Sequence, residues 1–424
     1  MIEKIIHGPL LIPLPSGKVE YFADGALAMD GKGIIEFAGD RKKLGSAPAP
    51  ARKSDGVILP PLLDVHTHIP QHPIRGRFAE GVGENEPGGK LLGALKRNVF
   101  PAETKCGQSD YAAKVIEAFA ADVLASGVVG GAAYMTVSAA ATELALEILP
   151  ETWSVGLVMM NQNCPQTLRT DEKNLAEDIA RMARRFGRRL IVTDRFAVAT
   201  DTPLRKAGSG LAREYGLRTQ THLNEQVGEK NFVEKELYPQ AESYTEVYLR
   251  DGLLEHQCIL AHCIHMTPVE WDLLAETGGA VAHCPTSNLK LDSGLMRLDD
   301  VLKHGIEYAI ATDVGASPTV SMLAEMKRFL DMQEGHSKTA TPAEALWRAT
   351  MAPARILGIE SSVGRLETGR PASFIEVEAN GIGDGSVDGV IRSLLPVDAD
   401  EPRATVSRVT LKGKVMFERN SRHA

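Results

Sequence analysis

Two histidines one residue apart are the first residues of this chain whose types and spacing could do chemistry. His66 and His68 stand at the end of an apolar run that begins at Leu59. If this run is a strand, its period of two places both imidazoles on one face, where they can share a metal ion. The run should end here, because a proline and polar residues follow, and barrel enzymes keep their chemistry at the carboxyl ends of strands. Alone, the pair fits a metal site and a chance pair of core histidines equally well.

Later apolar runs end in the same kind of side chain, which strengthens the metal interpretation. A lone histidine is more often structural, but polar residues repeated at one mouth of a barrel need a common cause. A metal site is the simplest such cause. The residues that end these runs are His222, His262, His283 and Asp313.

A catalytic zinc takes nitrogen and oxygen ligands and leaves one position for water. Such an ion lowers the pKa of its water from about 16 to about 7, which yields hydroxide near neutral pH. We predict one divalent ion per chain, because Arg195 stands at the end of the fourth strand where a lysine would be needed to bridge two ions. Zn²⁺ is preferred and Fe²⁺ is an alternative, since these ligands suit several ions. The predicted ligands are His66, His68, His222 and Asp313.

Three side chains are predicted to act on protons beside this ion. Glu225 follows His222 by three residues, close enough to reach the same cavity without being a ligand. A glutamate there can take a proton from water and deliver it to a ring nitrogen or a leaving amine. His262 would form a hydrogen bond with the metal-bound water or serve as a further metal ligand. Asp313 would share in proton transfer. The alternative for Glu225 is a glutamate near the N-cap of the next helix.

The elements that must position these residues alternate between strand-like and helical patterns. Eight strands followed by helices predict an α/β fold, a (β/α)₈ TIM barrel. Its strands are apolar throughout, as expected when both faces are covered. The helices expected between them include 143–149, 172–186 and 204–215. After the strand ending at His68, the predicted strands are 128–135, 153–160, 190–196, 217–222, 258–262, 279–283 and 306–312.

The two ends of the chain differ from this central part. Short apolar segments separated by glycine, proline and charged residues indicate small antiparallel sheet in both. We expect residues 1–58 and 367–424 to meet in one small β-sandwich domain, with the barrel formed by residues 59–366. Residues 77–103, which are glycine-rich and then helical from 90 to 98, could cover the barrel mouth as a lid.

Composition excludes several classes of protein. The 424 residues carry a net charge of −8, which argues against a nucleic-acid-binding surface. No apolar run approaches the roughly 18 residues of a membrane span, and the first residues do not resemble a signal peptide. The five cysteines are scattered, so neither a disulfide framework nor a cysteine zinc site is indicated. These features predict a cytoplasmic protein with no nucleic-acid or membrane partner.

The motifs at the strand ends resemble those of the amidohydrolase superfamily and, within it, of guanine deaminases. They extend from the first predicted strand to the last, so the resemblance covers the whole barrel. The segments that carry it are 66–71 (HTHIPQ), 100–103 (FPAE), 195–196 (RF), 221–225 (THLNE), 244–248 (YTEVY), 260–263 (LAHC), 282–289 (AHCPTSNL) and 311–316 (ATDVGA).

This resemblance implies a hydrolytic deamination within purine catabolism, carried out by a homodimer. A metal-bound hydroxide would attack the amino-bearing C2 of guanine, and Glu225 would protonate the neighbouring ring nitrogen, leaving xanthine and ammonia. The residues matching Gln71, Arg195 and Phe196 would hold the purine. An arginine fork matches the O6/N7 edge of guanine, an aromatic ring covers the base, and a glutamine offers a donor and an acceptor. The alternative for Arg195 is an ion pair with Asp194 or Asp201.

Some positions depart from the family pattern and leave other substrates open. Asp194 stands where guanine deaminases usually have a proline. Residues 197–201 and Pro318 also differ from the residues usual in that family, and Ser373 stands where the superfamily commonly has an aspartate. The same chemistry could act on isoxanthopterin or another pterin, another aminopurine, a thioadenosine or an aminotriazine, and a wider pocket would favour a pterin. A further alternative is a non-catalytic barrel that binds a partner, which has no need to retain a stoichiometric ion.

Overall fold

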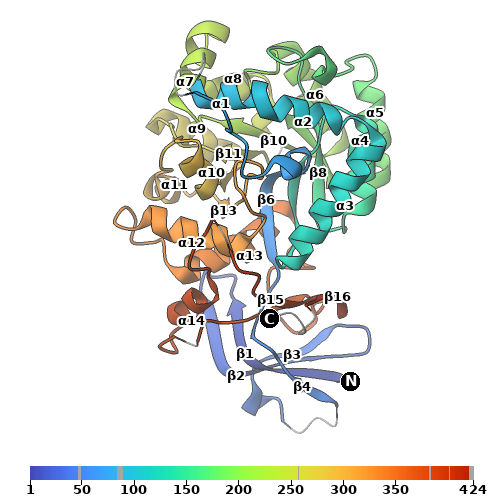
Figure 1. Ribbon diagram of the computed structural model, residues 1–424, viewed down its shortest axis with the longest axis vertical. Helices are drawn as coiled ribbons and strands as arrows, with labels where there is room; N and C mark the ends of the chain where they lie inside the picture. The colour runs from blue at the N-terminus through green and yellow to red at the C-terminus, as the bar shows by residue number, and fades with distance from the viewer. Residues whose placement is uncertain (46–48, 84–88, 256, 382, 401, 420–424) are drawn as a thin grey trace. The chain divides into compact units, whose positions relative to one another are not determined.

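The computed structural model describes residues 1–45, 49–83, 89–255, 257–381, 383–400 and 402–419 (Figure 1). The chain divides into two compact units. One unit comprises Met1–Asp64, Ala121–Val129 and Val320–Ala424, and the other comprises Val65–Ala120 and Gly130–Thr319. The predicted domain boundaries near residues 58 and 366 stay a prediction.

A closed sheet of parallel strands forms the frame of the second unit. Its order follows the sequence from β6 to β13, and every pairing described from β7 to β13 is parallel. The sheet closes where the N–H of Asp313 donates to the carbonyl of His66 at 2.8 Å and that of His68 to Val314 at 2.9 Å. The predicted (β/α)₈ barrel is confirmed. The strands are β6 (Leu62–His68), β7 (Val128–Tyr134), β8 (Trp153–Met159), β9 (Leu190–Asp194), β10 (Arg218–Leu223), β11 (Ile259–His262), β12 (Ala280–His283) and β13 (Tyr308–Ile310).

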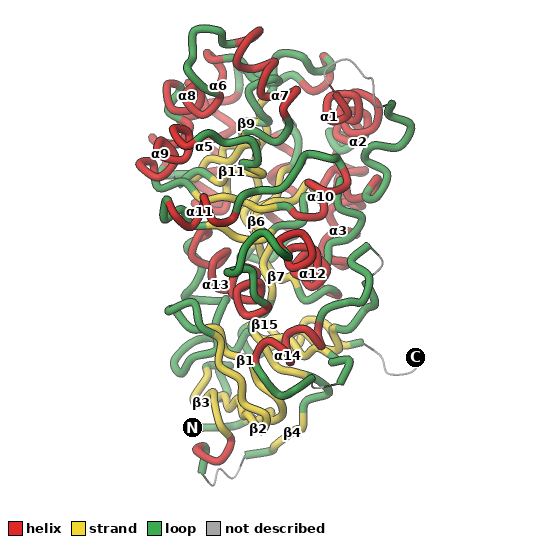
Figure 2. Tube along the Cα trace, turned by 90° about the vertical axis from the view of Figure 1, so that its left-hand side faces the viewer, coloured by secondary structure: helices red, strands yellow, loops and turns green. Residues whose placement is uncertain are grey.

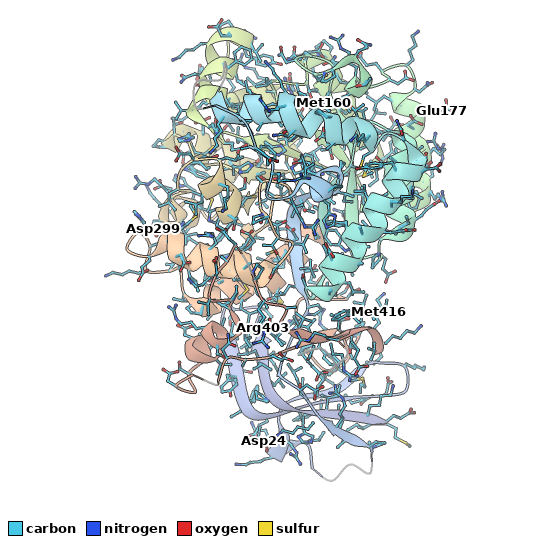
Figure 3. All side chains as sticks on the ribbon, viewed as in Figure 1. Asp24, Met160, Glu177, Asp299, Arg403 and Met416 are labelled. Carbon is cyan, nitrogen blue, oxygen red and sulfur yellow. The ribbon has the colours of Figure 1, made fainter. Side chains whose placement is uncertain are left out.

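Helices lie outside these strands, with α4 packed against β8 and α6 against β9 (Figure 1). Met160, the residue after β8, is fully buried, whereas Glu177 and Asp299 point outward (Figure 3). The helices up to residue 303 are α1 (Gly89–Ala94), α2 (Phe100–Lys105), α3 (Ser109–Ala125), α4 (Ala139–Ile148), α5 (Leu175–Phe186), α6 (Thr202–Tyr215), α7 (Val227–Phe232), α8 (Tyr244–Arg250), α9 (Pro268–Thr277), α10 (Pro285–Lys290) and α11 (Leu298–Lys303).

Capping residues explain where helices depart from the sequence expectation. Ser138 accepts a hydrogen bond from the backbone N–H of Ala141, so α4 begins four residues before the predicted helix 143–149. Asp201 accepts one from Leu204, so α6 begins at Thr202, and Gly216, in the left-handed region with φ of 62°, ends it. The predicted helix 90–98 is α1 followed by a π-helical turn, Leu95–Val99.

The first unit contains a mixed sheet built from both ends of the chain. β5 pairs antiparallel with β14, with Ile58 opposite Glu376, so the predicted meeting of the termini is confirmed. Leu10, Leu27 and Phe374 pack together in its core. The strands are β1 (Lys4–Pro13), β2 (Val19–Met29), β3 (Ile35–Asp40), β4 (Ala51–Lys53), β5 (Val57–Leu59), β14 (Phe374–Val377), β15 (Val406–Leu411) and β16 (Lys414–Glu418).

Three helices of the first unit lie near the end of the chain, and none of them was predicted from the sequence. Figure 2 shows strands and helices of the whole chain in separate colours. Among the described residues, no helix is long and apolar enough to cross a membrane. The three helices are α12 (Met322–Gln333), α13 (Pro342–Leu357) and α14 (Val387–Leu394).

Candidate active site

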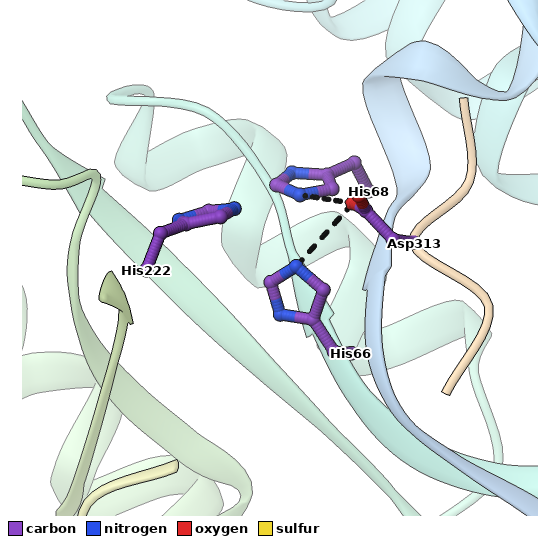
Figure 4. A group of neighbouring side chains, drawn as sticks. All are labelled: His66, His68, His222 and Asp313. Atoms are coloured by element: carbon purple, nitrogen blue, oxygen red, sulfur yellow. Dashed lines mark ion pairs between the residues drawn. The ribbon is translucent and has the colours of Figure 1, made fainter. Parts of the chain in front are cut away.

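Four side chains from three strand ends converge in the barrel unit (Figure 4). His66 and His68 come from β6, His222 from β10, and Asp313 follows β13. Asp313 Oδ1 lies 3.3 Å from His66 Nε2 and 3.1 Å from His68 Nε2. One ligand atom from each residue lies within 4.8 Å of those of the other three, and all four residues are buried. The structure therefore brings the four predicted metal ligands together.

The electrostatics of this cluster suit a cation. Burial lowers the pKa of His68 to about 3 and holds the pKa of His66 and His222 below the ordinary value, so their imidazoles are neutral at pH 7. The backbone carbonyl of Arg195 lies 2.8 Å from His222 Nδ1. Nδ1 must donate there, which leaves the lone pair on Nε2 facing the cluster. Neutral imidazoles and one carboxylate are a donor set that fits a divalent ion.

Glu225 and His262 face each other beside the cluster. Glu225 Oε2 lies 3.5 Å from His262 Nε2, and Ser293 Oγ donates to Glu225 Oε1 at 3.3 Å. Burial, with the nearby charge of Asp313, raises the pKa of Glu225 to about 8. Asn288 Oδ1 lies 2.9 Å from His262 Nδ1 and fixes that nitrogen as a donor. These contacts leave a carboxyl able to exchange a proton next to an imidazole nitrogen that accepts hydrogen bonds.

Glu225 does lie in the N-cap region of the next helix, one residue before its N-cap, but its side chain does not cap that helix. Gln226 is the N-cap of α7, and Glu229 completes its capping box. Glu229 Oε2 accepts hydrogen bonds from the backbone N–H groups of Glu225 at 3.0 Å and of Gln226 at 3.2 Å. Capping by Glu229 thus holds the backbone of Glu225 and leaves the Glu225 side chain for the site.

Strained backbone marks three of the strand ends in the site. Asn224, His262 and Asp313 have φ values of 51°, 72° and 52°, in the left-handed region. A non-glycine residue there costs roughly 1–3 kcal/mol and persists only where the surrounding structure fixes it. Such residues gather at active sites, and here they follow or end three strands of one barrel.

The three predicted substrate-binding residues line one cavity with the cluster. Gln71 follows β6, Arg195 and Phe196 follow β9, and the cavity wall also includes His68, His222, Glu225 and Asp313. About 20 Å³ of free volume remains inside, which is room for a water molecule. Arg195 Nη1 lies 3.3 Å from His222 Nε2, and Nη2 lies 3.6 Å from the carboxylate of Glu103.

The alternative that Arg195 pairs with Asp194 or Asp201 is wrong. Asp194 Oδ2 accepts a hydrogen bond from Thr221 Oγ1 at 2.8 Å, and its Oδ1 lies 3.8 Å from Arg205. Asp201 caps α6. Asp194, the main departure from the family pattern, therefore does not line the cavity and belongs to a buried network behind it.

Sequence reasoning missed three residues that contact the site. Glu103, Asn288 and Ser293 hold Gln71, His262 and Glu225 respectively. Glu103 and Asn288 lie in segments that carried the resemblance, so the motifs were their only signal. His283 is buried at the end of β12 and is not in either group of potential metal ligands found among the described residues. The second of these groups is His66, His262 and Cys284.

A larger cavity adjoins the one that holds the cluster. It has a volume of about 910 Å³, and Leu95 and Phe196 line both cavities. Leu92, Phe100 and Phe232 give it an apolar wall, while Lys96, Arg169 and Lys235 add positive charge. We call the two the inner cavity and the outer cavity.

Comparison with known proteins places this geometry in context. A sequence profile of the amidohydrolase family matches residues 57–416. The chain is similar to guanine deaminase of Escherichia coli, with 29% identity over 378 residues, 86% of this chain and 84% of the relative. A probable guanine deaminase of Deinococcus radiodurans is 30% identical over 387 residues, 86% of this chain and 85% of the relative.

Solved structures agree with the sequence relatives. The E. coli guanine deaminase structure has a TM-score of 0.85 and 25% identity, covering 99% of this chain and all of the other. Guanine deaminase from C. acetobutylicum, solved with guanine bound in its active site, has a TM-score of 0.83 and 24% identity, over 98% and 100% of the two chains. The latter likeness shows a shared fold.

Proposed function

Because the chain belongs to the amidohydrolase family, we propose that it is a guanine deaminase, which converts guanine and water to xanthine and ammonia. The observation that carries this proposal is the inner cavity. One cavity is lined by three of the four candidate metal ligands, His68, His222 and Asp313, together with Glu225 and the purine-binding set Gln71, Arg195 and Phe196. The similarity to guanine deaminases over most of the chain supports the choice of substrate.

The family is metal-dependent, and His66, His68, His222 and Asp313 are the residues proposed to hold the ion. When bound, a divalent ion supplies Lewis acidity that makes water a nucleophile near neutral pH. One ion per chain, with zinc preferred, fits three imidazoles and one carboxylate. A homodimer, a cytoplasmic location and a role in purine catabolism stay predictions.

The proton transfers are assigned to Glu225 and Asp313, and the orientation of the water to His262. Glu225 takes a proton from the attacking water and passes it to the ring nitrogen beside C2. The hydroxyl then bonded to C2 gives up its proton, which Asp313 or Glu225 passes to the amino group, so the C2–N bond breaks, ammonia leaves and the C2 carbonyl of xanthine forms. Ser293 holds one carboxylate oxygen of Glu225, so the other is aimed at His262 and the water. His262, whose Nδ1–H is held by Asn288, accepts a hydrogen bond through Nε2 and orients the water.

Arg195, Gln71 and Phe196 are proposed to hold the purine. The planar guanidinium of Arg195 can donate two parallel hydrogen bonds to O6 and N7 of guanine. Phe196, buried beside it, offers a ring face for the base. Gln71 offers a donor and an acceptor to the ring edge.

Arg195→Lys should lower kcat/KM for guanine by roughly 10- to 100-fold, because a point charge cannot replace a two-pronged contact worth about 1–3 kcal/mol. Steady-state kinetics on guanine would measure this, with metal content recorded for each protein. Arg169→Lys, in the outer cavity, is the matched control and should behave as the wild type. Unchanged guanine kinetics in Arg195→Lys would mean that Arg195 is structural.

The outer cavity favours a second candidate, the deamination of a wider heterocycle such as isoxanthopterin. The inner cavity has room for a water molecule, so any ring must displace part of its wall. Leu95 and Phe196 line both this cavity and the outer cavity, which has a volume of about 910 Å³. They are therefore the side chains that would move to admit a larger ring. A ring wider than a purine would extend past them.

Leu95→Ala tests this wall. Shortening a buried side chain between the two cavities should raise kcat/KM for isoxanthopterin relative to guanine by roughly tenfold, since a pocket discriminates by about 1–3 kcal/mol per methylene. Ammonia release would be followed with guanine, isoxanthopterin, adenine, a thioadenosine and an aminotriazine. Leu92→Ala, which lines only the outer cavity, is the control. An unchanged ratio would show that Leu95 does not limit ring size.

Ammonia release from these five substrates also separates the proposed function from its alternatives. Preferential release from guanine by the wild type supports the proposal, whereas release from another substrate with guanine inert transfers the mechanism to that substrate. A barrel that only binds a partner would release no ammonia and would not retain a stoichiometric metal ion.

A further inference from the structure

Glu103 is a buried carboxylate that the proposed proton transfers do not use. It lies in the first turn of α2 and is 2% exposed. Its Oε1 accepts a hydrogen bond from Gln71 Nε2 at 3.2 Å and lies 3.6 Å from Arg195 Nη2. Its Oε2 has no hydrogen-bond partner among the described residues. A buried carboxylate is costly unless it is paired, so these two contacts need an explanation.

The first contact fixes the direction of the Gln71 amide. A carboxylate accepts and cannot donate, so the NH₂ end of the amide must face Glu103. The backbone N–H of Gly315 donates to Gln71 Oε1 at 3.4 Å, which holds the other end. A Cβ at position 315 would lie 2.9 Å from the backbone oxygen of Gln71, so glycine permits this close approach. One N–H and one lone pair of the amide are then left for a ring in the inner cavity.

The second contact offsets the charge of Arg195. Arg195 is 4% exposed, and its Nη1 lies 3.3 Å from Nε2 of His222. Among the described residues, Glu103 is the carboxylate with which Arg195 forms an ion pair. A buried cation without such a partner would be strongly unfavourable. Glu103 therefore places the fork of Arg195 as well as the amide of Gln71.

We infer that Glu103 is a positioning residue that sets substrate specificity, by orienting Gln71 and Arg195 together. The oriented pair presents the guanidinium donors to one ring edge and a fixed amide to another. The class of ring that fits has two adjacent acceptors, a carbonyl oxygen and a ring nitrogen, as in 6-oxopurines. Adenine does not fit, because its exocyclic amino group would place donors against the guanidinium. This inference rests on the proposed function and names the substrate class of the same site.

Three variants separate positioning from a purely structural role. Glu103→Gln loses the charge and the directional constraint, Gln71→Glu places two carboxylates together, and the double variant Gln71→Glu/Glu103→Gln restores one amide and one carboxylate. In the double variant the hydrogen bond runs in the opposite direction, so the contact is kept while the group facing the ring is reversed. Glu172→Gln, at an exposed glutamate, is the control.

Glu103→Gln should raise KM for guanine and Kd for the product xanthine together by at least about tenfold, with a smaller change in kcat. Xanthine binding would be measured by calorimetry and Tm by thermal denaturation. The double variant should have the Tm of the wild type but should not regain the wild-type affinity for xanthine. Recovery of both, or unchanged KM and Kd in Glu103→Gln, would overturn the inference.

Two further observations keep the test decisive. If the double variant does not fold, Glu103→Asp replaces it, because the charge is kept but the shorter side chain cannot hold Gln71 and Arg195 at the same distances. Its KM and Kd should then rise as in Glu103→Gln, and wild-type values would contradict the inference. If the wild type does not deaminate guanine, the proposed function itself is wrong. This outcome differs from an active enzyme whose KM and Kd do not change when Glu103 is replaced, which contradicts only the inference about Glu103.

Discussion

Replacing Glu225 by glutamine should leave the protein folded and metal-loaded while lowering kcat on guanine by at least about 100-fold. Glutamine has nearly the same shape, and its carbonyl oxygen can still accept the hydrogen bond from Ser293. It cannot take up or release a proton under the conditions of the reaction. The loss therefore measures proton transfer with little change in packing.

The measurement needs three readings on each protein: kcat and KM for guanine, metal content by elemental analysis, and Tm. Glu236→Gln, at an exposed glutamate of the outer cavity, makes the same substitution without touching the inner cavity. It should match the wild type in all three readings. Near-normal turnover in Glu225→Gln would remove Glu225 from the mechanism and direct attention to His262 and Asp313.

The strand-end residues were predictable because two simple regularities coincide. Parallel strands of a barrel end at one mouth, and a polar residue at the end of an apolar run is visible in the sequence. His222, His262 and Asp313 were each found in this way, and their side chains do gather in the structure. Alternation along the strand also explains Asp194, since neighbouring residues face opposite sides. Arg195 faces the inner cavity and Asp194 faces Arg205 behind it.

Contacts between distant segments were not predictable in this way. Glu103 reaches Gln71 from a helix 32 residues further along the chain, and no periodicity gives the direction of that helix. The pairing of β5 with β14 joins segments more than 300 residues apart, which the sequence suggested only through their similar texture. Glu225 and Glu229 both stand near the start of α7, and only the geometry shows which one caps the helix.

The second large effect is expected from Asp313→Ala. Asp313 is the one carboxylate of the proposed ligand set, and the other three ligands are neutral imidazoles, so its removal leaves a divalent ion without an anionic ligand. Metal content should fall well below one ion per chain, and guanine turnover should fall by roughly 1000-fold or more. The barrel itself should still close, because the hydrogen bond from residue 313 to the carbonyl of His66 is made by the backbone.

Elemental analysis and a zinc titration followed by Tm would measure the loss of binding independently of activity. An ion that binds only the folded state raises Tm, and more so the more tightly it binds, so the wild type should be stabilised by added zinc and Asp313→Ala much less. Asp299→Asn, at an exposed aspartate of the same unit, should bind and turn over as the wild type. A variant Asp313→Ala that retained one ion per chain and full activity would exclude Asp313 from the ligand set. It would leave His66, His262 and Cys284, which also lie within 4.8 Å of one another, as the ligands to test next.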